Sequence, residues 1–119
     1  MKLREIIKIT QGTVLTRHTN LNMEIQHCGA MDLMSDALAY MPPASMLLTG
    51  LKNIQTIRTA EMAQVKAILF VRGKTPDQDA VHLAEELGIP LIKTNYGMFE
   101  SCGRLYKEGM APVYVAHRD

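Results

Sequence analysis

The chain has 119 residues, enough for one domain with a single hydrophobic core. Hydrophobic residues make up 47% and charged residues 21%, which excludes an intrinsically disordered chain. The 13 Lys and Arg are nearly balanced by 12 Asp and Glu, and Trp is absent, so neither charge nor stacking aromatics predict a nucleic-acid or membrane partner.

Neither a targeting segment nor a membrane span is expected. Residues 1–8 place charges between their apolar positions, unlike the apolar stretch of a signal peptide. Apolar runs are far shorter than the ~20 residues that cross a bilayer. We therefore expect a cytoplasmic protein. Its two Cys are too few for a disulfide framework.

The N-terminal third predicts short, irregular elements. Apolar spacing and turn residues indicate a helix over 2–9, strands over 13–16 and 23–28, and a helix over 32–40. Asp32 stands at the start of the second helix, where its carboxylate can cap the first turn. The pattern leaves the place of residues 1–30 in a sheet open.

From Ser45 onward, apolar runs and amphipathic segments alternate regularly. The predicted strands cover 46–48, 67–71 and 90–92, and the predicted helices cover 54–64, 76–87 and 97–108. Residues 112–116 form either a closing strand or a tail. Short connections between such elements imply parallel strands with right-handed crossovers. We predict a single three-layer α/β domain over residues 1–119, with a mainly parallel sheet, a βαβαβα core and an N-terminal embellishment.

Helix ends and faces follow from particular residues. Asn53 is suited to cap the helix over 54–64. Thr75, with Pro76 and Gln78 behind it, matches a capping box for the next helix, and Gly88 matches its end. In the last helix the predicted inward residues are Phe99, Cys102, Leu105 and Tyr106.

Methionine is frequent, with 9 residues. Met is flexible, so it suits either an irregular core or an adaptable contact surface. Both interpretations apply to Met31, Met34, Met41 and Met46.

Polar and basic residues gather at three predicted strand-to-helix junctions. Ligands of open α/β sheets bind at the carboxyl ends of the strands, where helix N-termini also favour anions. The candidate ligand-binding residues are Thr49, Gly50, Lys52, Asn53, Arg72, Gly73, Lys74, Lys93 and Thr94. The alternative is that the glycines and hydroxyls serve turns and caps while the cations are solvated.

No catalytic constellation is evident. The chain lacks the P-loop, GxGxxG and GxSxG motifs. His27, Cys28 and Cys102 lack the spacing of a metal site. We therefore predict no catalytic residues, no metal, no cofactor and no enzyme activity.

Several segments, in this order, resemble the DRTGG domain family. This family includes a segment beside CBS domains in some inorganic pyrophosphatases and is related to the N-terminal domain of HPr kinase/phosphorylase. The resemblance is strongest over 28–110. The segments that carry it are Asp32-Leu33-Met34-Ser35-Asp36, Asn53-Ile54, Ala67-Ile68-Leu69, Pro76-Asp77, Leu87-Gly88-Ile89-Pro90-Leu91, Phe99-Glu100 and Gly103-Arg104-Leu105-Tyr106.

The chain departs from the family at the string Asp-Arg-Thr-Gly-Gly, which is absent. After the central strand it has Val71-Arg72-Gly73 where relatives often have Thr-Gly-Gly. The chain looks like the small stand-alone members of the family found near iron-only hydrogenases and anti-sigma-type kinases in anaerobic bacteria.

The resemblance implies a non-catalytic regulatory module, often a homodimer, with a protein partner in a bacterial signalling or hydrogenase-associated system. Together with the predicted junctions, it leads us to expect a dimeric sensor domain that binds a small anionic ligand such as a nucleotide. The alternative is an interaction module without a small-molecule ligand.

Overall fold

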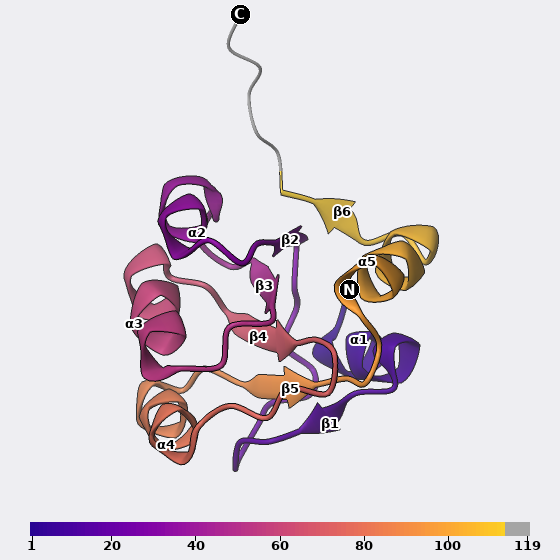
Figure 1. Cartoon of the computed structure of the whole chain (residues 1–119). Helices are drawn as coiled ribbons and strands as arrows, with labels where there is room; N and C mark the ends of the chain where they lie inside the picture. Colours follow the sequence, from indigo (N-terminus) through magenta and orange to yellow (C-terminus); the bar gives the residue numbers. More distant parts are fainter. Residues whose placement is uncertain (114–119) are drawn as a thin grey trace, which may run out of the picture.

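Helices and strands alternate along the chain largely as the sequence predicts (Figure 1). The computed structural model describes residues 1–113. Within them the elements are α1 (Leu3–Thr10), β1 (Thr13–Val14), β2 (His27–Ala30), α2 (Met34–Tyr40), β3 (Met46–Thr49), α3 (Ile54–Ala63), β4 (Ala67–Phe70), α4 (Gln78–Leu87), β5 (Leu91–Lys93), α5 (Met98–Lys107) and β6 (Ala111–Pro112).

One sheet contains all six strands, in the order β1-β5-β4-β3-β2-β6. Among the strands of residues 1–113, the pairs from β5 through β6 are parallel, and only β1 runs antiparallel, against β5. This arrangement confirms the predicted α/β class and the mainly parallel sheet. It also places the N-terminal residues, because β1 forms one side edge of the sheet and β2 inserts between β3 and β6.

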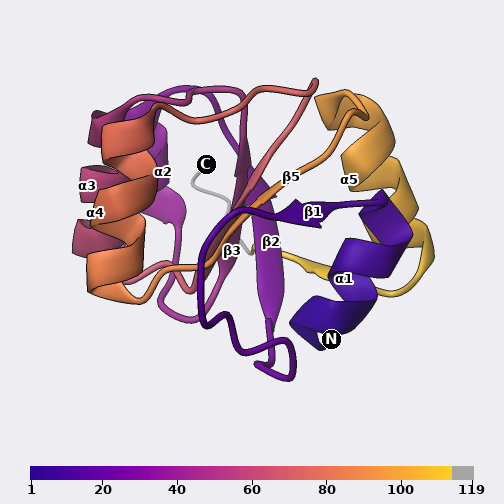
Figure 2. The ribbon, with the colours of Figure 1, turned by 90° about the horizontal axis from the view of Figure 1, so that it is seen from below.

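Helices cover both faces of the sheet, which gives the predicted three layers. Figure 2 shows α2, α3 and α4 on one face and α1 and α5 on the other. All residues of β3 and β4 are buried, because side chains on both sides of these strands meet helices. Leu47, Ile68 and Phe70 belong to the core under α2–α4. Met46 and Leu48 belong to the core under α1 and α5.

Two helix starts differ from the prediction. Asp32 does not cap α2, whose N-cap is Leu33 without a side-chain hydrogen bond. The capping box at Thr75 is also wrong, because α4 begins only after Asp77. The Asp77 N–H donates to the Lys52 carbonyl at 3.1 Å, which ties the segment before α4 to the neighbouring loop. Asp77 itself is still extended, with φ of −60° and ψ of 150°, so the helix starts later than predicted.

The other two helix ends are as predicted. The side chain of Asn53 accepts a hydrogen bond from the Thr56 N–H and caps α3. Gly88 ends α4 in the left-handed conformation with φ of 72°.

Helix α5 turns a different face to the core than predicted. Leu105 is buried and Cys102 is half-buried, but Phe99 is 93% exposed and Tyr106 is 69% exposed. Ser101 and Leu105 define the buried side. Phe99 lies about 200° around the helix from Ser101, so it must point outward once that side packs.

The four methionines with two possible roles belong to the hydrophobic core or pack against it. Met41 and Met46 are buried, while Met31 and Met34 pack against the core from partly buried positions. The prediction for residues 112–116 holds only for the start of the segment, since β6 covers Ala111–Pro112 and residues 114–116 lie outside the described part. No helix within residues 1–113 is long and apolar enough to cross a membrane.

Candidate functional site

The carboxyl ends of the parallel strands lie level with one another. The sheet register pairs Thr49 with Phe70 and Phe70 with Lys93, so β3, β4 and β5 end side by side. Ala30 pairs with Leu48, so the segment after β2 reaches the same place. We call this surface the rim and define it as Asp32 with residues 49–53, 72–75 and 93–97.

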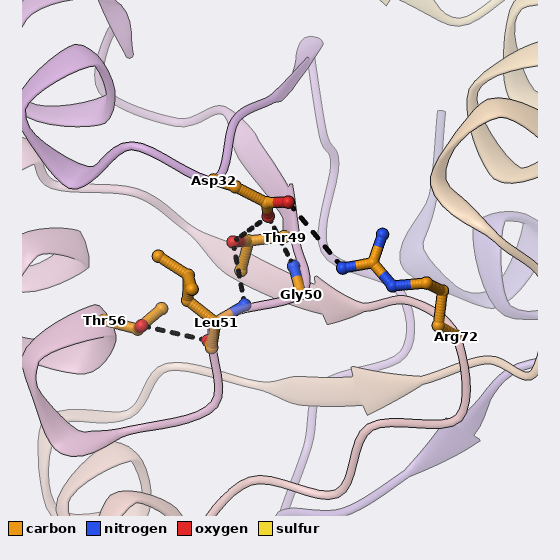
Figure 3. A network of polar contacts seen from close by, with 6 residues as sticks. All are labelled: Asp32, Thr49, Gly50, Leu51, Thr56 and Arg72. Atoms are coloured by element: carbon orange, nitrogen blue, oxygen red, sulfur yellow. Dashed lines mark hydrogen bonds and ion pairs between the residues drawn. The ribbon is translucent and has the colours of Figure 1, made fainter.

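Asp32 is the centre of the polar contacts on the rim (Figure 3). Its Oδ1 accepts hydrogen bonds from the Gly50 N–H at 2.7 Å and from the Thr49 hydroxyl at 3.0 Å. Its Oδ2 lies 3.7 Å from Nη2 of Arg72. The Thr49 hydroxyl oxygen in turn accepts from the Leu51 N–H at 3.2 Å. One carboxylate thus joins the loops that follow β2, β3 and β4.

These contacts stabilise the charged form of Asp32. The hydrogen bond from the Gly50 N–H is the largest cause that holds the pKa of Asp32 below its ordinary value of 3.8. Partial desolvation opposes this shift, while the Thr49 hydroxyl and the Arg72 charge lower the pKa further. Asp32 is therefore an anion at neutral pH.

Arg72 is held in an unusual backbone conformation. Its φ is 61° and that of Gly73 is 67°, and the Lys74 N–H donates to the Val71 carbonyl at 3.3 Å to close the turn. Two more hydrogen bonds fix the turn against the loop after β5: Arg72 N–H to the Tyr96 carbonyl at 2.7 Å and Gly73 N–H to Thr94 at 2.8 Å. The left-handed backbone conformation costs free energy for an arginine. It persists here because the hydrogen bonds to the loop after β5 hold the turn in place.

The guanidinium of Arg72 lies directly over Gly50. A Cβ added at Gly50 would stand 3.1 Å from the Arg72 Cζ and closer still to Nη2. The absence of a side chain at Gly50 therefore lets Arg72 reach Asp32.

The rim lysines lie on two loops and at the end of β5. Lys52 lies 3.4 Å from the Asp77 carboxylate, and Lys93 donates to the Thr75 hydroxyl at 3.2 Å. Lys74 is exposed on the turn after β4. All four cations thus belong to the rim, and the Lys52 side chain is the one paired with a carboxylate on the segment before α4.

Other predicted ligand residues have structural roles in the fold. Asn53 caps α3. Thr94 is buried, and its hydroxyl donates to the Thr10 carbonyl at 2.6 Å and accepts from the Tyr96 N–H at 3.2 Å. The Gly73 N–H is used within the turn, and the Gly50 N–H is used by Asp32. The glycines and hydroxyls of the rim therefore mainly build the loops, and the cations are the groups that face outward.

Asp32 has a different role from the helix cap that the sequence predicts. The predicted helix over 32–40 begins at Asp32, and an aspartate at this position favours a capping role. In the structure β2 runs to Ala30, only two residues before Asp32. A carboxylate just after one strand and Thr-Gly just after the next would have indicated the contact.

The thiols lie away from the rim, where α5 covers the sheet: Cys28 belongs to β2 and Cys102 to α5. Cys28 and Cys102 both line an apolar hollow of about 370 Å³. Burial raises the pKa of Cys28 to about 12, so this thiol is protonated and a poor nucleophile at neutral pH. Among residues 1–113, no three His, Cys, Asp or Glu side chains gather as a metal site would require.

The comparison with family models decides the relationship of the chain. The model described as DRTGG domain matches residues 5–107. The chain belongs to the DRTGG domain family. The match includes every loop of the rim, so Asp32 and Arg72 are part of the DRTGG domain itself. No curated protein matches the chain.

A solved structure shares the fold of this DRTGG domain. It is the crystal structure of the CBS and DRTGG domains of the regulatory region of Clostridium perfringens pyrophosphatase, complexed with the activator diadenosine tetraphosphate. The TM-score is 0.70 at 16% sequence identity, over 99% of this chain and 51% of the other. The chain therefore spans about half the length of that regulatory region.

Proposed function

We propose that the chain is a non-catalytic regulatory domain that binds a small anionic ligand, such as a nucleotide, at the rim. The observation that carries the proposal is the position of Arg72. A strained turn and the bare backbone of Gly50 hold its guanidinium beside the loops after β2 and β3. Guanidinium groups bind phosphates through paired donors, and strained backbone is common where a ligand binds.

The charges of the rim support an anion as the ligand. Lys74 adds a cation from the loop after β4, and Lys93 adds one from the end of β5. The carboxylate of Asp32 shows that an anion is stabilised at this place. It accepts hydrogen bonds from a backbone N–H and a hydroxyl, and it lies beside the positive charge of Arg72. A phosphate of the ligand would take over the Arg72 contact. The related regulatory region binds diadenosine tetraphosphate, which is a polyanion with the same chemistry.

Isothermal titration calorimetry with diadenosine tetraphosphate, ATP and inorganic phosphate tests the proposal. We expect saturable binding of at least one nucleotide, with Arg72→Ala and Lys93→Ala each weakening it about tenfold or more. Arg58→Ala is the matched control, because Arg58 is a half-exposed arginine paired with Glu61 on α3, outside the rim. This variant should bind as the wild type does.

The absence of binding heat for all three probes would contradict the proposal. So would a nucleotide that binds Arg72→Ala as tightly as the wild type, because the ligand would then lie elsewhere.

The second candidate function is an interaction module without a small-molecule ligand. The exposed aromatic side chains of α5 favour it, since large apolar groups on a surface mark protein contacts. Its partner would belong to a bacterial signalling or hydrogenase-associated system, as the resemblance implies. The two candidates differ in the calorimetric experiment, where only the first predicts a loss of nucleotide binding in Arg72→Ala.

A further inference from the structure

Helix α5 carries an apolar stripe that faces outward. Phe99 is 93% exposed and Tyr106 is 69% exposed. Gly103 lies between them and is also exposed. The spacing i, i+4, i+7 puts the three residues on one side of the helix. Phe99 and Gly103 line both the open groove of about 1010 Å³ toward α1 and the apolar hollow of about 370 Å³ toward β6. The stripe is thus a ridge between two depressions.

Nothing within residues 1–113 explains the glycine at position 103. Its place in the middle of α5 destabilises the helix relative to alanine. A Cβ built on it meets no atom of the described residues within 4 Å apart from its chain neighbours and the nearby backbone of α5, and its φ is not positive. Neither packing nor backbone conformation therefore requires a glycine. A glycine in an exposed stripe does allow the backbone of another helix to approach closely.

The charges of α5 indicate which helix approaches. Glu100 and Lys107 lie seven residues apart, so they share one flank of the stripe. In an antiparallel helix pair, residues on equivalent flanks of the two helices face each other. Glu100 of one copy would then face Lys107 of the other, and the reverse contact would form by symmetry.

The remaining cation of α5 is already engaged within the chain. Arg104 contacts Oε2 of Glu100 through Nε at 2.9 Å and Nη2 at 2.8 Å. Its guanidinium also lies 4.3 Å from the centre of the Tyr96 ring. Within residues 1–113 no partner contacts Oε1 of Glu100, so that oxygen is available for a lysine of a second molecule.

We propose that α5 is the contact surface between two copies of this chain, paired antiparallel about a two-fold axis that passes near Gly103. Phe99 of each copy lies over the apolar hollow beside Tyr106 of the other. The pair is isologous, so each contact occurs twice. This surface is separate from the rim, and the pairing does not depend on the proposed ligand.

Sedimentation velocity over a range of protein concentrations tests the pairing. We expect a monomer–dimer equilibrium for the wild type, and Phe99→Ser should weaken the dimer about tenfold or more. Phe99 is so exposed that its replacement leaves the fold intact. Met62→Ser is the matched control, because Met62 is 63% exposed on α3. This variant should dimerise as the wild type does.

Gly103→Ala separates pairing from stability. The substitution should raise the melting temperature of the monomeric Phe99→Ser background, because alanine is the better helix former. In the wild-type background it should weaken the dimer, because the added Cβ stands between the two backbones. A glycine that matters only for the fold of one chain would not give these opposite effects.

Two further variants test the antiparallel register. Gly103→Cys, made together with Cys28→Ser and Cys102→Ser, should form an intermolecular disulfide under mild oxidation, because residues near a two-fold axis meet their own copies. Glu100→Lys and Lys107→Glu should each weaken the dimer, and the double variant should restore it.

The inference is overturned if the wild type sediments as a monomer at every concentration. It is equally overturned if a dimer forms that Phe99→Ser and Gly103→Ala leave unchanged. Nucleotide binding at the rim would survive either result, so failure of the pairing is distinguishable from failure of the proposed function.

Discussion

Asp32 connects three loops through one side chain, and its protonation should be visible in the stability of the protein. The pKa of Asp32 is lowered in the folded chain relative to the ordinary value of 3.8. A carboxyl group whose pKa is lower in the folded than in the unfolded chain stabilises the fold at pH values above its unfolded pKa. This contribution disappears as the pH falls through the folded pKa. The acid limb of the stability curve should therefore depend on this residue.

Asp32→Asn tests this at the residue scale. The variant should have a lower free energy of unfolding than the wild type near neutral pH, and the difference should shrink as the pH falls below 3.8. Urea denaturation at a series of pH values measures it. Asp36→Asn, an exposed carboxylate on α2, is the control and should show a smaller difference. A difference that is constant with pH would contradict the assigned role of Asp32.

The same variant has an opposite effect on the proposed ligand. Removing one negative charge about 4 Å from a bound phosphate is worth about 1 kcal/mol in water, or about fivefold in affinity. Asp32→Asn should therefore bind a nucleotide several times more tightly than the wild type, as calorimetry would show. Weaker binding would mean that Asp32 contacts the ligand as an acceptor rather than competing with it.

Gly50 leaves room for the guanidinium of Arg72. A Cβ there would displace the tip of Arg72, which is the flexible end of a long side chain. Gly50→Ala should thus leave the fold nearly as stable but lower nucleotide affinity by moving Arg72 away. An unchanged affinity would show that the position of the guanidinium over Gly50 is not needed.

At the scale of elements, the start of α3 tests whether a helix cap predicted from the sequence stabilises the fold. Asn53 caps it through a hydrogen bond to the Thr56 N–H at 3.3 Å, and the Thr56 hydroxyl donates to the Leu51 carbonyl at 2.9 Å. Asn53→Ala should cost about 1 kcal/mol of unfolding free energy, measured by denaturant titration. Gln55→Ala, exposed on the same helix, should change it by less than about 0.5 kcal/mol.

The central strands and α3 could be predicted because their signals are local. Runs of apolar residues such as Ala67–Phe70 indicate strands buried on both faces, and the structure confirms them. The face of α5 could not be predicted, because periodicity identifies an amphipathic helix without showing which apolar residues meet the core. Here Ser101 is buried and Phe99 is not, which reverses the order that hydrophobicity alone suggests.

The sequence predicts which loops meet at the rim but not the hydrogen bonds that join them. Alternating strands and helices place the loops after β3, β4 and β5 together, so Arg72 and Lys93 were identified as neighbours. The contact between Asp32 and Gly50 depends on β2 lying parallel beside β3, which no local pattern reveals. Long-range pairing of this kind follows from the whole sheet rather than from any one segment.

At the scale of the whole molecule, pairing and ligand binding should both change thermal stability. If two chains associate through α5, the melting temperature rises with protein concentration. Differential scanning calorimetry should show this rise in the wild type and not in Phe99→Ser. Saturating nucleotide at about 100 times its dissociation constant should add about 2.7 kcal/mol of stability to both proteins. A melting temperature independent of protein concentration in the wild type would contradict the association.

The side edges of the sheet restrict how the domain can aggregate. Both outer strands are only two residues long, and β6 contains Pro112, which has no N–H to donate to an incoming strand. Within residues 1–113 the sheet therefore offers poor templates for strand addition, so misassembly into β-rich fibres is disfavoured. A partner of the described domain would therefore bind the helical surfaces or the loops rather than extend the sheet.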